Sequence, residues 1–283
     1  MTSMPGSAGP VNAITHRFST AKPLDVSVRN QAGTVEITAA DVAETTVEIV
    51  PNDAKGAELA ERTRVQLSED AGRLRIDVPD RRMLRQPALE IIVTLPTGSS
   101  LDVQTATADV QTRGVLDSAT VTTASGDVSL AHVRERLEVT TASGDIHVGH
   151  GDGPVQIRSA SGDVRVDVSG TEASVQTASG AVMIGRLSGD LTARSASGDV
   201  IVGSASAGSV QAKTMSGDVI IGVATGLLLW LDVSSLSGDV ASELGPDDSV
   251  AGPGAEAGEH DSGPDLRISA STMSGDVLLR RGR

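Results

Sequence analysis

The sequence predicts an all-β protein: a single-stranded parallel β-solenoid, or β-helix, with coils of about 18 residues and an N-terminal β-rich cap. Three observations predict this fold. A Ser-Gly-Asp motif recurs along the chain, first at a constant interval. Apolar and polar residues alternate on both sides of the motif, which is the period of a β-strand. The 283-residue chain is also rich in glycine and in small or β-branched side chains, and 1% of its residues are aromatic.

The glycines of the motif locate the repeats. They are Gly126, Gly144, Gly162, Gly180, Gly198, Gly217, Gly238 and Gly275. The first four steps between them are equal, and the next three are longer, with the longest from Gly238 to Gly275. A degenerate copy, TATADV at residues 105–110, precedes the first complete motif by the same interval as the equal steps. About nine repeats are therefore expected from Leu101 to the C-terminus.

Each repeat contains two short strands, one on either side of the Ser-Gly-Asp corner. Around Gly144, for example, the apolar residues are Leu137 and Val139 before the glycine and Ile146 and Val148 after it. Two strands and two corners account for one coil of a parallel solenoid. Equivalent residues of successive coils then stack about 4.7–4.9 Å apart, and the inward side chains form columns that no single coil could bury alone.

The solenoid is expected to occupy residues 101–283, with a cap before it. Residues 15–100 alternate like strands but do not repeat, and residues 54–63 read as a short helix or a loop. We expect residues 1–14 to be disordered. Residues 245–265 are rich in glycine, proline and acid, which predicts a flexible acidic insertion within one repeat.

An open solenoid end exposes unpaired strand edges and part of the core, so both ends need protection. Residues 15–100 are the candidate cap at the N-terminal end. At the other end, we expect the charges of Arg280, Arg281 and Arg283 to blunt the last edge.

Composition excludes several classes of function. A net charge of −14 argues against binding to phosphate backbones, and the two aromatic residues, Phe18 and Trp230, cannot form a stacking platform for nucleic acid. The chain has no cysteine. Its N-terminus lacks a basic and then apolar secretory pattern, and its most apolar run, residues 226–233, is too short to span a bilayer. These features predict a cytoplasmic protein without a membrane span.

The repeats TASGDV, SASGDV and TMSGDV, with strands such as GTVEIT before them and WLDVSSLSGDV and STMSGDVLLR at the end, resemble a known family. It is the family of bacterial β-strand-repeat proteins called domain of unknown function 4097, labelled "putative adhesin". The resemblance covers nearly the whole chain. It implies a β-solenoid and an adhesin-like role, and it supplies no catalytic residues and no ligand.

The aspartates that follow the motif glycines form a column, which Ala181 interrupts. They are Asp127, Asp145, Asp163, Asp199, Asp218, Asp239 and Asp276. We favour a structural interpretation, in which glycine adopts a positive φ and the Ser and Asp side chains bond to backbone amides at the bend.

Two chemical interpretations of the column remain open. Calcium could relieve the repulsion between stacked carboxylates, and the candidate ligands are Asp127, Asp145, Asp163, Asp199 and Asp218. The opposite corner carries no repeated acid, so half of a calcium ligand set is missing and calcium binding is not expected. Glycoside cleavage needs one differentiated pair of carboxylates, whereas this column repeats the same group in every coil.

The remaining candidates for chemistry are few. His147, His150 and Asp152 are clustered in the sequence, and we interpret them as exposed loop groups rather than as a metal site. The motif serines lack a strand-to-helix elbow and a positioned histidine. We therefore predict no catalytic residue and no cofactor.

An outward position of the repeat predicts a partner surface. The residue three after the glycine is polar in early coils (Ser129, His147 and Arg165). It becomes apolar in later coils, as Met183, Ile201, Ile220 and Leu278. Such a stripe marks either a site for self-association or a protein partner, or a surface covered by the N-terminal cap. Trp230 is expected to plug the core or an edge.

These observations predict a non-enzymatic β-solenoid scaffold or adhesin-like protein that mediates self-association or binds a protein partner. An exported adhesin or polysaccharide-binding module is the alternative. A carbohydrate-active β-helix enzyme is the third hypothesis.

Overall fold

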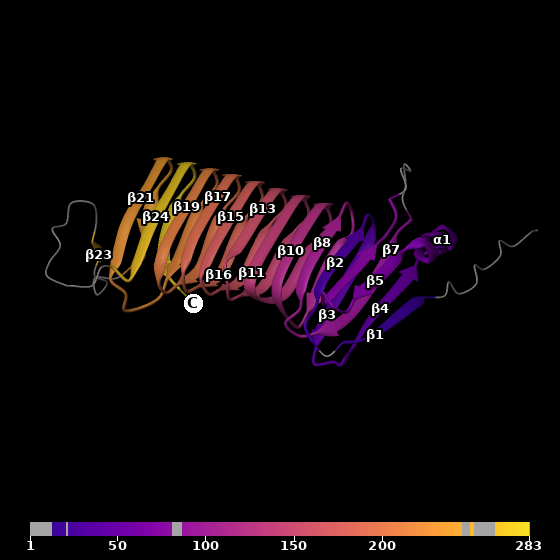
Figure 1. Cartoon of the computed structure of the whole chain (residues 1–283). Coiled ribbons are helices and arrows are strands. Elements are labelled where there is room, and N and C mark those ends of the chain that lie inside the picture. Colours follow the sequence, from indigo (N-terminus) through magenta and orange to yellow (C-terminus); the bar gives the residue numbers. More distant parts are fainter. Residues whose placement is uncertain (1–12, 21, 81–86, 245–249, 252–263, 283) are drawn as a thin grey trace, which may run out of the picture.

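The computed structural model describes residues 13–20, 22–80, 87–244, 250–251 and 264–282. Within them the chain forms one helix and a continuous series of strands (Figure 1). The predicted disordered segment 1–14 lies almost entirely outside the described residues, as does most of the predicted insertion 245–265.

The strands wind into a solenoid in which each coil contributes one strand to each of two facing sheets. The first sheet contains β2 (Asp25–Asn30), β6 (Arg73–Asp77), β8 (Ser100–Thr105), β10 (Val115–Ser125), β13 (Val155–Ser161), β15 (Glu172–Ser179), β17 (Asp190–Ser197), β19 (Gly208–Ser216), β21 (Leu229–Ser237), β23 (Val250–Ala251) and β24 (Leu266–Ser274). The second sheet contains β3 (Gly33–Ala40), β7 (Leu89–Pro96), β9 (Asp109–Arg113), β12 (Ile146–Gly151), β14 (Val164–Ser169), β16 (Val182–Leu187), β18 (Val200–Ala205), β20 (Val219–Val223), β22 (Val240–Ser242) and β25 (Val277–Arg281). The long strand β11 (Val128–Ser143) turns a corner and contributes to both sheets.

Successive coils pair in parallel and in register, as the repeat predicts. Leu137 lies opposite Val155, and Val139 lies opposite Ile157, so equivalent positions of adjacent coils are neighbours. The same pairing continues to Ala173 and Val175 in the next coil. These inward side chains are at most 2% exposed, so the predicted columns form the core.

The C-terminal coil does not lie at the end of the stack. Strand β24 pairs with β19 on one side and with β21 on the other, and β25 lies between β20 and β22. Figure 1 shows the yellow β24 between the orange strands β19 and β21. The last coil of the chain is therefore inserted between its two predecessors.

This arrangement corrects the expectation that Arg280 and Arg281 blunt the last edge. β25 is not the outermost strand, because β22 pairs with its first residues, Val277–Leu279. Arg280 and Arg281 follow them and pair with β20 alone, and Arg283 lies outside the described residues. The outermost coil is instead the one formed by β21 and β22. The long step between Gly238 and Gly275 is the reason, because it lets the chain pass the outermost coil and return beneath it.

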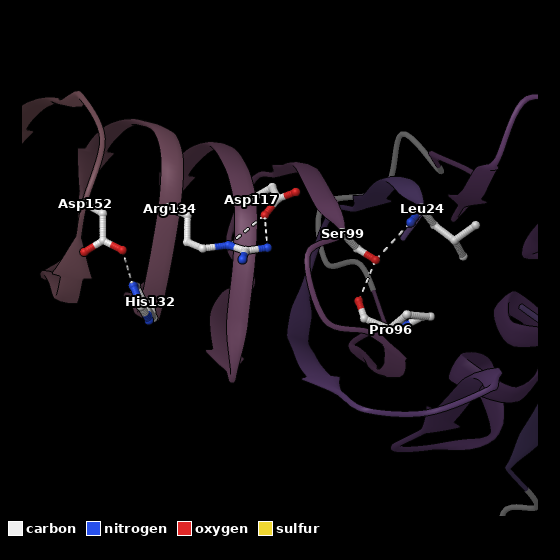
Figure 2. Close-up of polar contacts among 7 residues, drawn as sticks. All are labelled: Leu24, Pro96, Ser99, Asp117, His132, Arg134 and Asp152. Atoms are coloured by element: carbon white, nitrogen blue, oxygen red, sulfur yellow. Dashed lines mark hydrogen bonds and ion pairs between the residues drawn. The ribbon is translucent and has the colours of Figure 1, made fainter. Parts of the chain in front are cut away.

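The N-terminal end has the same kind of insertion. Strand β2 lies between β6 and β8, and β3 lies between β7 and β9. The first coil of the chain is thus second in the stack. Figure 2 shows a contact that fastens this junction: Leu24 N donates to Ser99 Oγ at 3.0 Å, and Ser99 Oγ donates to Pro96 O at 2.7 Å.

Antiparallel elements close the N-terminal end of the stack. They are β1 (Ile14–Ser19), β4 (Glu44–Pro51), α1 (Ala54–Arg62) and β5 (Arg64–Ser68). The helix predicted as an option for residues 54–63 is confirmed. Asp53 caps it by accepting a 2.6 Å hydrogen bond from Gly56 N, and Leu59 and Ala60 are buried.

Candidate binding surfaces

The Ser-Gly-Asp corner needs glycine for two reasons. All eight motif glycines have φ between +111° and +152°, a region that L side chains rarely adopt. The coils also pass very close to one another at this point. A Cβ placed on Gly162 would lie 2.2 Å from Gly144 O, and one on Gly180 would lie 2.2 Å from Gly162 O.

The corner aspartates form a ladder of hydrogen bonds to backbone. In each rung the amide after a motif glycine donates to Oδ1 of the aspartate in the adjacent coil, as from Asp145 N to Asp127 at 2.9 Å. The acceptors are Asp109, Asp127, Asp145, Asp163, Asp199, Asp218 and Asp276. Asp109 belongs to the degenerate copy and extends the ladder upstream.

Each of the five calcium candidates is therefore a backbone acceptor. Threonines and serines two residues before the motif serine also form hydrogen bonds at the corners. Thr177 Oγ1 donates to Ser179 O at 2.9 Å, and Ser159 Oγ donates to Ser161 O at 2.8 Å. Among the described residues, no three histidine or acidic side chains are arranged to hold a metal ion. The geometry supports the structural interpretation of the aspartate column.

The histidines that cluster in the sequence separate in space. His147 lies on β12, and its Nε2 is 2.9 Å from Asp167 Oδ2 on β14. Arg165 Nε donates to the other oxygen of Asp167 at 2.7 Å. The hydrogen bond with His147 lowers the pKa of Asp167; burial opposes this shift, and the hydrogen bond and charge of Arg165 reinforce it.

His150 and Asp152 face a different histidine at the corner opposite Ser-Gly-Asp. His132 Nε2 is 2.7 Å from Asp152 Oδ2, and the rings of His132 and His150 are 5.2 Å apart. Nearby, Arg134 Nε donates to Asp117 at 2.9 Å (Figure 2). Each of these pairs joins side chains from adjacent coils, so short sequence distance did not identify the true partners.

The predicted apolar stripe lies in register along the outer side of the second sheet. Met183 is opposite Ile201, Ile201 is opposite Ile220, and Ile220 is opposite Leu278. All four side chains are partly exposed. The antiparallel strands of the cap pair with each other and with β6 and β7, at the other end of the solenoid. That the stripe is a partner surface remains a prediction.

A second apolar surface was not predicted. The residue two before the motif glycine is alanine from Ala124 to Ala196, and in the last three motifs it is Met215, Leu236 and Met273. These three are 57%, 79% and 52% exposed. Because β24 is inserted between β19 and β21, they stand in the spatial order Met215, Met273, Leu236. We call these three residues the apolar corner.

The outermost coil also has free edges. Beyond Trp230, which pairs with Ala251, the remaining part of β21 is paired only with β24, and β22 is paired only with β25, within the described residues. Val240 occupies an inward position, in register with the buried Val277. It is nevertheless 52% exposed, because no described coil packs over it. Trp230 lies on this edge strand, with the guanidinium of Arg267 4.9 Å from its ring centroid, so it does not plug the core.

The fold defines a class: a parallel β-solenoid repeat protein whose repeated polar groups form hydrogen bonds at its corners. The family model described as Toastrack DUF4097 matches residues 24–280, and the chain belongs to this family. The resemblance stated from the repeats is thereby confirmed.

The chain is also similar to solved structures that share little sequence with it. A "putative adhesin" from Bacteroides fragilis is 14% identical with a TM-score of 0.44, and 95% of this chain and 97% of that chain are covered. A "putative adhesin" from Parabacteroides distasonis is 12% identical with a TM-score of 0.38, with coverage of 95% and 97%. A "putative cell adhesion protein" from Clostridium sporogenes is 8% identical with a TM-score of 0.28, with coverage of 95% and 100%.

No curated protein matches the chain significantly. The described part of the chain also contains no helix with the length and apolar character needed to cross a membrane.

Proposed function

We propose that this protein is a non-enzymatic, adhesin-like scaffold that associates with a second copy of itself or with a protein partner through its C-terminal apolar surface. One observation carries the proposal. In the described part of the chain, the large hydrophobic side chains that are more than half exposed are Met215, Leu236, Val240 and Met273, and all four lie on the last three coils of the stack.

The apolar corner and the apolar stripe overlap on two coils. Met215 and Ile220 belong to one coil, and Met273 and Leu278 to the next. Only the Ser-Gly-Asp turn separates the two members of each pair. Exposed apolar side chains that gather in one region mark interaction sites more often than isolated ones do.

Strand edges without a partner among the described residues add a second means of association at this end. The backbone groups on the outer edges of β21 and β22 can pair with a further strand. The edge residues 231–237 (LDVSSLS) include one charge, Asp232, and no lysine or proline. Natural proteins use charged residues, especially lysine, and proline to block pairing at an exposed strand edge.

The arrangement of carboxylates supports a role other than catalysis. The corner aspartates repeat in equivalent environments and accept backbone hydrogen bonds, whereas a glycosidase requires two carboxyl groups with different environments.

Multi-angle light scattering with increasing protein concentration tests the proposal. We expect association by the natural chain and a weaker tendency in a Met215→Ser, Leu236→Ser, Met273→Ser variant. Ile201→Glu with Ile220→Glu tests the stripe separately. The matched control replaces Ala142, Ala160 and Ala178, in the same row of central coils, by serine.

Measurements with and without calcium separate a cation effect from the apolar effect. Association that requires calcium would contradict the proposal. If the natural chain stays monomeric at all concentrations, the self-association part of the proposal is wrong.

A further inference from the structure

The outer side of the first sheet carries a second surface, of a different chemistry. Strands β13, β15, β17, β19 and β24 lie side by side, and their outward residues form two rows in register. The first row is Gln156, Ser174, Thr192, Gln211 and Ser269. The second row is Arg158, Gln176, Arg194, Lys213 and Ser271. We call these ten residues the polar face.

The composition of the polar face departs from that of the whole chain. The protein has a net charge of −14, yet the polar face contains three cations, no acid and no apolar residue. Its other members are glutamine, serine and threonine. Where these rows continue beyond the face, the first one carries acids, with Glu138 on β11 and Asp102 on β8 at one end and Asp232 on β21 at the other.

The three cations of the polar face are free to bind a ligand. Arg158, Arg194 and Lys213 are exposed, and none of them has an ion pair with a described residue. Other arginines of the array are already paired, including Arg136 with Glu138 and Arg165 with Asp167.

Acids at the margins of the strands lie too far along the chain to neutralise this row. Glu172 and Asp190 begin β15 and β17, four residues before Gln176 and Arg194 respectively. Four residues of extended strand separate the Cα atoms by about 13 Å, and no ion pair among the described residues joins either acid to Arg158, Arg194 or Lys213. The row therefore remains a line of positive charge on an acidic protein.

We propose that the polar face binds a linear, carboxylate-bearing polysaccharide that lies along the solenoid axis. The guanidinium groups of Arg158 and Arg194 are suited to bidentate contact with carboxylates. They stand two coils apart, about 9.5 Å, and Lys213 follows one coil later. Cations placed along one line of the solenoid complement a linear polymer that carries carboxylates along its length.

The neutral residues of the polar face favour an anionic polymer of sugars over polyanions that lack hydroxyl groups. Amide and hydroxyl side chains can donate to and accept from sugar hydroxyls. A protein interface would need an apolar or aromatic centre, and a nucleic acid would gain from stacking residues; the polar face has neither. The polar face lies on the opposite sheet from the apolar stripe, but it shares β19 and β24 with Met215 and Met273 of the apolar corner. The titration is therefore repeated with the Met215→Ser, Leu236→Ser, Met273→Ser variant, whose binding should match that of the natural chain, so that failure of one proposal is distinguished from failure of the other.

Calorimetric titration of the full chain with polygalacturonate tests the proposal. We expect binding at low salt that weakens as salt is raised, because exposed charges are screened. Replacing Arg158, Arg194 and Lys213 by glutamine should weaken binding by about tenfold or more. The matched control, Arg165→Gln, Arg186→Gln and Arg280→Gln, removes the same charge from the second sheet and should bind within about twofold of the natural chain.

Urea denaturation of both triple variants checks that they fold like the natural chain. Three results would overturn the proposal: no binding of polygalacturonate at low salt, equal weakening in both triple variants, or equally tight binding of poly-glutamate or DNA. The last result would show that charge alone, without the sugar hydroxyls, is recognised.

Discussion

At the level of single residues, glycine and aspartate have different roles in the Ser-Gly-Asp turn. Glycine permits both the positive φ and the close approach of adjacent coils. Aspartate provides the acceptor for an amide that the turn leaves without a strand partner. The side chain of the motif serine forms no such hydrogen bond among the described residues. The expectation that it would also bond to an amide at the bend is therefore not supported.

Gly162→Ala tests the need for glycine. The substitution imposes a side chain at φ +111° and places Cβ 2.2 Å from Gly144 O, so we expect a loss of more than about 2 kcal/mol in the free energy of unfolding. Gly72→Ala is the control, since Gly72 has φ +58° but no atom within 4 Å of its Cβ position. It should cost about 1 kcal/mol. Urea denaturation measures both, and equal losses would contradict the role of close approach.

Ala181 offers a test of the ladder in the opposite direction. It stands where an aspartate would accept from Asp199 N, so the ladder lacks one rung there. Ala181→Asn should stabilise the protein by about 0.5–1 kcal/mol by supplying the acceptor. Ala181→Asp should stabilise it less, because of repulsion by the neighbouring carboxylates.

Thermal denaturation at low salt, with and without calcium, compares the two Ala181 variants. A calcium-dependent gain confined to Ala181→Asp would support a cation site in the column. No gain in either variant would contradict the importance of the backbone acceptor.

At the level of elements, parallel register turns residues one coil apart into neighbours. His147, Arg165 and Asp167 meet on β12 and β14 because the two strands are paired in register. The same register separates His147 from His150, which follows it by three residues.

Asp167 gives the β12–β14 pair a dependence on pH. Its pKa is lower when folded than the usual carboxyl value near 4, so its contribution is complete above that value. The contribution is lost as pH falls through the lowered folded pKa. Because Asp167 and its partners are substantially exposed, we expect it to be below about 1 kcal/mol.

Asp167→Asn should therefore reduce the melting temperature at neutral pH and have almost no effect at the acid limit. Melting temperatures recorded from neutral to acidic pH, beside those of Asp102→Asn, measure the difference. A difference that persists unchanged in acid would show that the carboxylate charge is not responsible.

At the level of the whole molecule, the first and the last coil formed by the described chain are held inside the stack. Residues of β2 and β3 lie beneath β6 and β7, and β24 and β25 lie beneath β21 and β22. The outermost coils thus depend on strands from the terminal parts of the chain. This arrangement makes the ends cooperative with the interior of the solenoid.

Truncation after residue 264 tests this dependence. It removes β24 and β25, which are the main partners of β21 and β22, so hydrogen-exchange protection of residues 229–242 should be lost. Protection of β13 and β15 should persist and serves as the internal control. Residues 229–242 that stay protected would show that β21 can pair directly with β19, and that insertion of the last coil is not required.

The solenoid could be predicted because its signals are local and repeated. The constant period of the motif, the alternation around Gly144 and the turn chemistry of Ser-Gly-Asp can each be read from one or two coils. The inward columns, the positive φ of the glycines and the role of the aspartates follow from them. The residues of the apolar stripe could be identified from their position in the repeat for the same reason. That the stripe binds a partner remains a prediction.

The sequence by itself determined the coil: its length, its two strands and the residues that turn its corners. Only the tertiary structure decided the order of the coils at each end. A coil has the same pairing edges as every other coil, so local sequence cannot specify which neighbour it joins when a long connection allows a choice. That choice places Met273 between Met215 and Leu236, and it leaves β21 and β22 at the open edge.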